Sequence, residues 1–519
     1  MRNLNNNKKL IILAGFFSAL FLLSRIPRIS SDEINPDGVN WHYRMQQFVV
    51  GLKTGQLEKT YQHYHPGVTF MWIAGIPVEI YKQITNISNY DMYNFQTFHL
   101  VAKLSLVTAQ LVLSLLALIL LAKLIGAGKA FFTVLLFSLE PFFLGNSRLF
   151  HMDVLLTLFL LNALLITFLA IKYKNIKLTA LSGTFLALSF LTKSIGIGAL
   201  VFVLLFTMLL FIKEKNSWYL KKFVPILLIS YIVSLFLFFP AMFKGPIYYL
   251  SEIFSESERI GIRNGHGQII FGEYTREAGL SFYPLVLLMK VSPLTLAGLL
   301  ISIYFLVRDL FGRKITFSKL LSSPFFFCLI FYLGYFLVMS LPSKKIDRYM
   351  IPIYPIIAWA AVEAFGRIAG GTTRIKSVIV ALALLSSAAF IVYPDVKLFP
   401  YYFTYTSPLF GSPEQANKVI AQKSFGIGIF DLKKAIVSKY GTKAKLGFID
   451  IKPIEAIYPN SQVFDIRDYG PGSYDYVVLG INEEMTDKVL DDKRFHFEKD
   501  LSLYINGLEY WRVYAKKVK

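Results

Sequence analysis

Apolar residues run in long blocks through the first 393 residues, and short polar stretches separate the blocks. A helix needs about 20 mainly apolar residues to cross the hydrocarbon core of a bilayer. Blocks of nearly this length, without the alternation of a half-buried strand, predict membrane-spanning helices. We expect about eleven of them, near residues 10–25, 100–122, 130–145, 154–171, 178–193, 195–212, 223–240, 284–307, 324–341, 351–365 and 377–393.

The pattern changes after residue 393. The stretch PEQANKVIAQKSFGIGIFDLKKAIVSKYG has the polar faces of a surface helix, and AKLGFIDI, YDYVVLGI and YWRVYAK are typical of strands. About 125 residues are enough for a small soluble domain. We therefore predict an α-helical polytopic membrane domain over residues 1–393 and a C-terminal soluble α/β domain over residues 394–519.

Composition agrees with a membrane protein. The chain is 55% hydrophobic with a mean hydropathy of +0.51, and 17% of its residues are charged, whereas soluble domains carry roughly a quarter. The first apolar block follows Lys8 and Lys9 as in a signal peptide, but no small-residue cleavage site comes after it. We expect this block to remain as an anchor. The single cysteine, Cys328, allows no disulfide framework.

Charge indicates the orientation. The net charge is +21, but the basic residues punctuate the apolar blocks instead of forming one stripe, which argues against a nucleic-acid partner. With the N-terminus in the cytoplasm, the cytoplasmic connections hold 19 lysines and arginines and the short outer connections hold 5. This bias follows the positive-inside rule. It predicts a multi-pass protein of the plasma or inner membrane, with a first outer loop at about residues 26–99 and an extracytoplasmic C-terminal domain.

The ionisable residues that interrupt apolar sequence mostly fall on the predicted outer face. Arginine and lysine are natural partners of phosphate oxygens, so a lipid phosphate at the membrane surface would explain the cations. Snorkelling of each cation to lipid headgroups remains an alternative. The residues are Asp37, Arg44, Arg148, His151, Asp153, Lys193, Lys290, Lys344, Lys345 and Arg348.

Residues 35–55 carry the signals of a helix in the first outer loop. Asn35 can cap it, Pro36 suits its first position, and Gly51 or Gly55 closes it. One face of this helix would then carry Asp37, Trp41, Arg44 and Phe48.

Asp37 has two competing explanations. An acid in the first turn complements the helix dipole without any catalytic role. The neighbouring acids Asp32 and Glu33 are also candidates for the chemistry of this loop.

The segment SRLFHMDVLLTLF, residues 147–159, places Arg148, His151 and Asp153 between two apolar blocks. Asp153 could simply cap the helix that begins at Val154. A divalent cation held by Asp153 with histidines is a further possibility. The histidines concerned are His63, His65 and His151.

Glu140 lies one to two turns inside an apolar block. An unpaired carboxylate would be costly there. We expect Glu140 to be paired with a cation or protonated, in a structural role.

Several segments together resemble the GT-C superfamily of polytopic glycosyltransferases. SRLFHMDVLLTLF is similar to the S-R-x4-D-x2-L-x2-F segment of the protein O-mannosyltransferases, and LTKSIGI (191–197) to their T/V-K-x-x-G segment. FYPLVLLMKVSP (282–293) and SLPSKKIDRYMIPIYP (340–355) resemble segments shared with the aminoarabinose transferases of lipid A, and YHPGVTFMW (64–72) resembles a His-Pro segment of bacterial members. These matches occur in the family's order over residues 35–355.

The resemblance implies a catalytic acid in the first outer loop, usually followed by Glu. Asp32–Glu33 keeps that pair literally, but Asp37 stands at the start of a helix, as the family's acid does. The β-trefoil insertion of the eukaryotic mannosyltransferases is absent from the outer loops, and a C-terminal soluble domain replaces it, which leaves a protein acceptor in doubt. The remaining roles implied are assistance by Asp153 and substrate binding by Arg44, His65, Arg148, His151, Lys193, Lys290, Lys344, Lys345, Arg348 and Tyr349.

We therefore predict transfer of a sugar from a polyprenyl- or dolichyl-phosphate donor to an acceptor hydroxyl on a lipid, glycan or protein. Asp37 would act as the base, Arg148 would contact the donor phosphate, and the anomeric carbon would be inverted. No cofactor is required, although a divalent cation could take part. A transporter or flippase of lipid-linked sugars is the alternative, though such proteins more often show inverted repeats and midplane charges. A non-catalytic scaffold is a third possibility.

Overall fold

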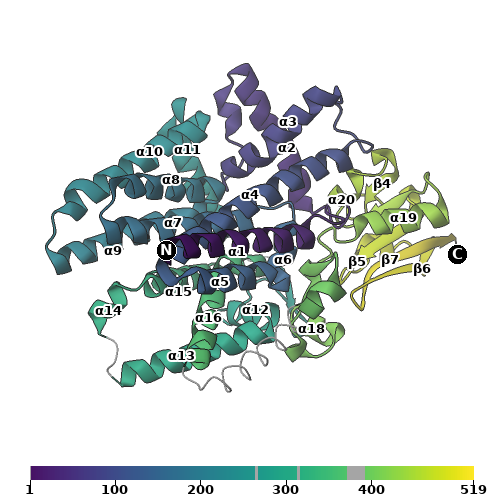
Figure 1. The fold of residues 1–519 in the computed structure, drawn as a ribbon. Coiled ribbons are helices and arrows are strands. Elements are labelled where there is room, and N and C mark those ends of the chain that lie inside the picture. The colour runs from purple at the N-terminus through teal and green to yellow at the C-terminus, as the bar shows by residue number, and fades with distance from the viewer. Residues whose placement is uncertain (1, 263–266, 313–315, 371–391, 519) are drawn as a thin grey trace.

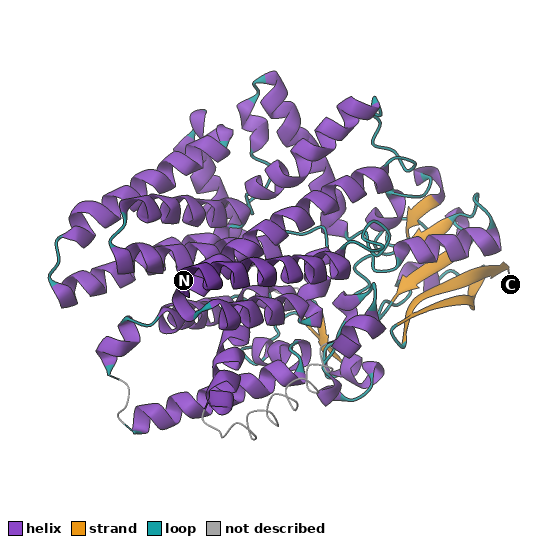
Figure 2. Cartoon of the chain, in the orientation of Figure 1, coloured by secondary structure: helices purple, strands orange, loops and turns teal. Residues whose placement is uncertain are grey.

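The computed structural model describes residues 2–262, 267–312, 316–370 and 392–518. Helices fill most of the molecule, and the strands of the C-terminal domain gather at one end (Figures 1 and 2). The helices before residue 371 are α1 (Arg2–Arg25), α2 (Pro36–Thr54), α3 (Val68–Thr85), α4 (Phe95–Ile125), α5 (Ala127–Leu139), α6 (Pro141–Arg148), α7 (Asp153–Tyr173), α8 (Ile176–Thr192), α9 (Ile197–Glu214), α10 (Val224–Phe238), α11 (Pro246–Ile262), α12 (Phe282–Lys290), α13 (Pro293–Phe311), α14 (Phe317–Leu321), α15 (Pro324–Ser340) and α16 (Tyr354–Gly370).

Helix α7 forms the centre of the bundle. Its sequence is apolar on every side, and 94% of its most apolar window is buried. A helix that is hydrophobic all round belongs inside a bundle, and α7 packs against α4, α8 and α15. The N-terminus of this helix carries Asp153, so the central helix presents an acid at the end near the C-terminal domain.

Seven helices in the described part of the chain are long and apolar enough to cross a membrane, or eight if α5 and α6 form one bent span. This is fewer than the eleven predicted. Helices α5 and α6 meet at an angle of 68°, and α8 and α15 have 17 residues each. The predicted span 284–307 is divided into α12 and α13. The predicted span at residues 377–393 lies almost wholly outside the described residues.

Glu140 stands at the bend between α5 and α6. Its carboxylate accepts hydrogen bonds from the Ser292 amide at 2.9 Å, the Ser292 hydroxyl at 2.6 Å and the Thr295 hydroxyl. These contacts agree with a structural role. Pairing with a cation, the first of the two predicted alternatives, is wrong, because the partners are hydroxyls and an amide; a protonated carboxyl group, the second alternative, stays a prediction. These contacts join the bend to the start of α13.

The predicted helix in the first loop is confirmed as α2. The Asn35 side chain accepts a hydrogen bond from Gly38 N at 2.6 Å, Pro36 occupies the first position, and Gly55 ends the helix with φ of 72°. The helix places Asp37 in its first turn, at the same end of the molecule as the start of α7.

The C-terminal domain contains a five-stranded mixed sheet in the order β4-β3-β5-β7-β6. Strands β3 (Leu446–Phe448), β4 (Val463–Asp465) and β5 (Tyr476–Gly480) are parallel, and β7 (Leu508–Val518) runs antiparallel to β5 and to β6 (Phe495–Ile505). The helices are α18 (Pro413–Val419), α19 (Ile429–Tyr440), α20 (Lys452–Glu455) and α21 (Asp487–Leu490). A small hairpin, β1 (Gln268–Ile270) and β2 (Glu273–Thr275), precedes α12.

The single helix predicted over residues 413–441 is instead two helices joined by a turn. Gly426 and Gly428 have φ of 68° and 69° in this turn, a conformation that favours glycine over other residues. Residues 424–428 form what we call the docking turn. They contact the first loop through Ile34 N to Gly426 O at 3.3 Å and Gly428 N to Asp32 O at 2.9 Å.

Candidate active site

A cavity of about 870 Å³ lies where the C-terminal domain meets the helices of the membrane domain. Its wall includes side chains from α2, from the segment before α7, from the segment after α15 and from the C-terminal domain. Nine of the twelve predicted site residues line it: Asp37, Arg44, His65, His151, Lys193, Lys290, Lys344, Arg348 and Tyr349. Segments that are far apart in the sequence therefore converge on one space.

Asp37 presents a carboxylate to this cavity. Its side chain is 42% exposed, and its Oδ2 lies 2.7 Å from Arg348 Nη2 and 3.7 Å from His151 Nε2. Burial raises the pKa of Asp37, but Arg348 and His151 outweigh it, so the pKa lies below its usual value. Asp37 is therefore ionised at neutral pH and can accept a proton.

Asp153 lies behind the cavity wall and connects its cations. The carboxylate is 2.7 Å from Lys193 Nζ, 2.9 Å from His151 Nδ1 and 3.2 Å from Arg348 Nε. Asp153 is the first residue of α7, and Met152 holds the cap position without a side-chain cap. The capping explanation for Asp153 is therefore wrong. Asp153 instead orients side chains that reach the cavity.

Arg348 bridges the two acids. One guanidinium nitrogen contacts Asp37 and another contacts Asp153. On the C-terminal side, the Phe425 ring centroid lies 4.8 Å from Arg348 Cζ. Phe425 belongs to the docking turn and has φ of 43°, which is uncommon for a bulky residue. The C-terminal domain therefore contacts the cation that joins the two acids.

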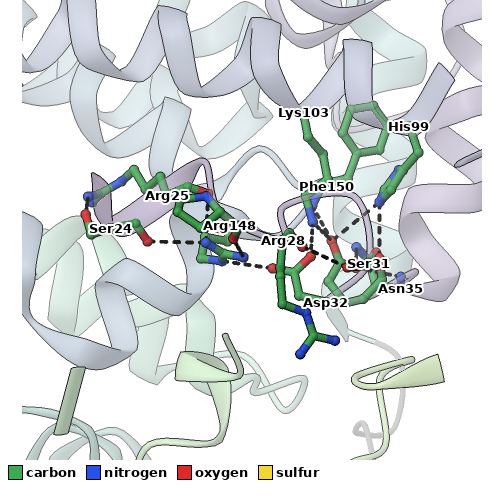
Figure 3. Close-up of polar contacts among 12 residues, drawn as sticks. Ser24, Arg25, Arg28, Ser31, Asp32, Asn35, His99, Lys103, Arg148 and Phe150 are labelled. Atoms are coloured by element: carbon green, nitrogen blue, oxygen red, sulfur yellow. Dashed lines mark hydrogen bonds and ion pairs between the residues drawn. The ribbon is translucent and has the colours of Figure 1, made fainter. Parts of the chain in front are cut away.

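Arg148 lies outside the cavity wall. Its Nε contacts Asp32 Oδ2 at 2.8 Å, and its other nitrogens donate to the carbonyls of Ser24, Arg25 and Pro27 at 2.7–3.2 Å (Figure 3). Arg148 is 2% exposed. The guanidinium N–H groups of Arg148 therefore already have partners within the protein. The geometry does not favour the predicted contact of Arg148 with the phosphate of the sugar donor.

Asp32 and Glu33 belong to the same buried cluster. Lys103 Nζ lies 2.7 Å from Asp32 Oδ1 and 2.9 Å from Glu33 Oε1 (Figure 3). The Glu33 carboxylate also accepts from the amides of Phe150 at 3.0 Å and Asn35 at 2.7 Å. Both acids are almost fully buried and neither lines the cavity. The geometry therefore favours Asp37 as the acid available to a substrate.

The predicted cation site of Asp153 with His63, His65 and His151 can be compared with the part of the chain that the structure describes. Within the described ranges, no cluster of three His, Cys, Asp or Glu residues could hold one. His63 has a pKa of about 3, lowered by burial and by Arg44. Burial and Lys193 likewise hold the pKa of His65 well below its usual value. Both rings are neutral at neutral pH.

The other predicted cations differ in placement. Lys290 Nζ donates to the Tyr405 carbonyl at 2.8 Å, and Arg44 Cζ lies 4.7 Å from the Trp41 ring centroid. Lys345 does not line the cavity, because its Nζ turns to the Pro342 carbonyl at 2.6 Å. Lys344, in contrast to Lys345, lines the cavity.

Sequence reasoning missed the contribution of the C-terminal domain. Asp450 follows strand β3, Arg467 follows β4, and Asn482 and Glu483 follow β5, and all of them line the cavity. Two of these strands were predicted, and polar residues at the carboxyl ends of parallel strands are a known position for ligand contacts. That rule could have marked Asp450 and Glu483.

Comparison with known proteins bears on this architecture. Residues 97–243 match the family model of dolichyl-phosphate-mannose-protein mannosyltransferases. No curated protein matches the chain.

Solved structures resemble the whole chain. ArnT from Cupriavidus metallidurans in the apo state matches with a TM-score of 0.50 at 14% identity, over 96% of this chain and 97% of that chain. The same protein bound to undecaprenyl phosphate gives a TM-score of 0.49 at 14% identity, over 96% of this chain and 97% of that one. A third match is the archaeal oligosaccharyltransferase AglB from Archaeoglobus fulgidus, in complex with an inhibitory peptide and a dolichol-phosphate. Its TM-score is 0.48 at 12% identity, over 92% of this chain and 70% of that chain.

At these identities the apo ArnT match establishes a similar fold and no more. Together with the family match, it confirms the predicted resemblance. The chain is thus a polytopic membrane protein that is similar to the dolichyl-phosphate-mannose-protein mannosyltransferases over residues 97–243 and to ArnT in its fold.

Proposed function

We propose that this protein transfers a sugar from a polyprenyl- or dolichyl-phosphate donor to an acceptor hydroxyl on the extracytoplasmic face of the cell membrane. The observation that carries the proposal is the Asp37 carboxylate, ionised and half-exposed in a cavity with a surplus of cations. Eight lysines and arginines line this cavity, against four aspartates and glutamates. Such a surplus suits an anionic donor.

The reaction is a single displacement at the anomeric carbon. The acceptor oxygen forms the new bond to that carbon as the bond to the phosphate oxygen breaks. Asp37 takes the acceptor proton, and the electron pair leaves with the polyprenyl phosphate. A base on the face opposite the leaving group implies inversion.

Cations at the cavity stabilise the charge that develops on the departing phosphate. Lys193 and Lys344 are our candidates for this role, since both line the cavity. Arg348 holds Asp37 ionised, and Asp153 keeps Lys193, His151 and Arg348 in place. Arg148 is left out of the donor site, because its donors are engaged elsewhere.

The test uses purified protein and a polyprenyl-phosphate sugar, with release of polyprenyl phosphate as the readout. Asp37→Asn keeps the shape of the side chain but cannot take the proton, so turnover should fall by roughly 10²–10⁴-fold. Donor binding should stay near that of the unaltered protein.

Asp91→Asn is a matched control, because Asp91 lies in the same loop region, away from the cavity wall. An active Asp37→Asn protein would contradict the proposed base. Transport of the intact lipid-linked sugar without its cleavage would favour the transporter alternative.

A further inference from the structure

The parallel strands of the C-terminal domain reverse their order next to the cavity. Strand β3 lies between β4 and β5 and is parallel to both. The chain passes from β3 to β4 on one side and then crosses to β5 on the other side. The gap between the carboxyl ends of β3 and β5 is therefore a topological switch point. Open α/β sheets bind ligands in the crevice outside such a point.

This switch point opens onto the cavity. The residues after β3 that line the cavity are Ile449 and Asp450, and those after β5 are Ile481, Asn482 and Glu483. They enter from the C-terminal domain, whereas Asp37 enters from α2. Lys452 of the C-terminal domain contacts helix α2 directly, because its Nζ donates a hydrogen bond to the Asn40 side-chain oxygen at 3.2 Å. Asn40 lies one turn of α2 after Asp37. We call the loops at residues 449–452 and 481–483 the switch loops.

The switch loops present carboxyl and amide groups. Glu483 is held in place, since it accepts from Gly480 N at 2.7 Å and from the Ser424 hydroxyl at 3.0 Å. Asn482 adopts φ of 59°, and its amide donates to the Gln422 carbonyl at 2.7 Å. Burial raises the pKa of Asp450 and of Glu483. The contacts of Glu483 and Asn482 fix the shape of the loop beside Asp450, and the two oxygens of the Asp450 carboxyl group can accept hydrogen bonds from several hydroxyls.

From this arrangement we infer that the switch loops bind the acceptor, and that the acceptor is a polyhydroxylated carbohydrate. This inference deepens the proposed function and rests on it for the identity of the bound molecule as an acceptor. The donor phosphate is served by the cations of the membrane domain.

A peptide acceptor fits this surface less well. Sheets that recognise extended peptides do so mainly along an edge strand, through backbone hydrogen bonds. Here the sheet meets the cavity at the ends of its strands, where side chains are presented. Asp450 is therefore a specificity-determining residue for hydroxyl-rich ligands.

The first experiment measures binding by the full-length protein in detergent, without a donor. The probes are printed oligosaccharides of hexose and N-acetylhexosamine units and printed serine- and threonine-containing peptides. Oligosaccharide binding should weaken by about tenfold or more in Asp450→Asn, since a charged hydrogen-bond acceptor is lost. Asp468→Asn is the matched control, because Asp468 belongs to the same domain but does not line the cavity.

The second experiment adds a polyprenyl-phosphate sugar and follows both its hydrolysis in water and its transfer to the oligosaccharide. Asp450→Asn should raise KM for the oligosaccharide, whereas Asp468→Asn should change neither this KM nor donor hydrolysis. Oligosaccharide binding that depends on Asp450 without donor cleavage would support the subsite and contradict the proposed transfer. An unchanged affinity in Asp450→Asn, or binding of peptides alone, would overturn the inference.

Discussion

Asp32→Asn should destabilise the protein without removing its chemistry. Asp32 is the carboxylate that faces two buried cations, Lys103 at 2.7 Å and Arg148 at 2.8 Å. With Glu33 the cluster holds two negative and two positive charges. The substitution keeps the shape of the side chain and leaves one positive charge without a carboxylate.

The expected cost follows from burial. All four charged side chains of the cluster are at most 4% exposed. Breaking a buried ion pair by removing one partner costs about 3–5 kcal/mol. The free energy of unfolding should fall by that amount. The carbonyls around Arg148 reduce the loss, so the lower part of the range applies.

The assay is unfolding in mixed detergent micelles, with turnover measured on the folded fraction. Lys53→Met is a control for the loss of a surface ion pair, because Lys53 contacts Glu79 with more than half of its side chain exposed. That variant should lose at most about 1 kcal/mol. If Asp32→Asn is as stable as the unaltered protein but inactive, Asp32 takes part in the chemistry and the present assignment of Asp37 is wrong.

Three further substitutions test the contacts around the cavity. Arg348→Ala removes the cation that lowers the pKa of Asp37, so the acid limb of the pH–rate profile should move to higher pH. If the acid limb does not move, Asp37 is not the group that titrates in it. Phe425→Leu should lower kcat severalfold with little change in donor KM, since a cation–π contact contributes about 0.5–2 kcal/mol; Phe425→Trp should restore kcat. Gly426→Ala should weaken the contact of the docking turn with the first loop, because a Cβ there would collide with the Ile34 carbonyl and φ is 68°. Faster protease cleavage between the domains would show this weakening, and a variant as resistant as the unaltered protein would contradict it.

The sequence was sufficient for the membrane domain and for helix α2. Apolar blocks and the Asn-Pro start are local patterns, and local patterns survive folding. The number of membrane spans was predicted less well. Helix α8 and helix α15 are short, and α5 bends into α6 at Glu140, where hydroxyl groups of a distant segment donate hydrogen bonds to the carboxylate.

Arg148 shows why the site could be predicted only in part. The motif drew attention to Arg148, but the direction of its guanidinium group depends on carbonyls of residues 24–27, more than 100 positions earlier. Asp450 shows the converse. Its type and its place near the end of a predicted strand were visible, yet its position on the same cavity as Asp37 depends on how two domains dock.

The docking turn ties the order of synthesis to the completion of the site. It holds the loop that carries Asp32 and Ile34, although about 390 residues separate the two segments. Chains elongate at about 5–20 residues per second, so the docking turn is synthesised roughly 20–80 s after the loop that it contacts. A ribosome-bound protein that lacks the turn also lacks Phe425 beside Arg348. Polypeptides released before residue 424 should therefore insert into the membrane without the contacts that complete the cavity.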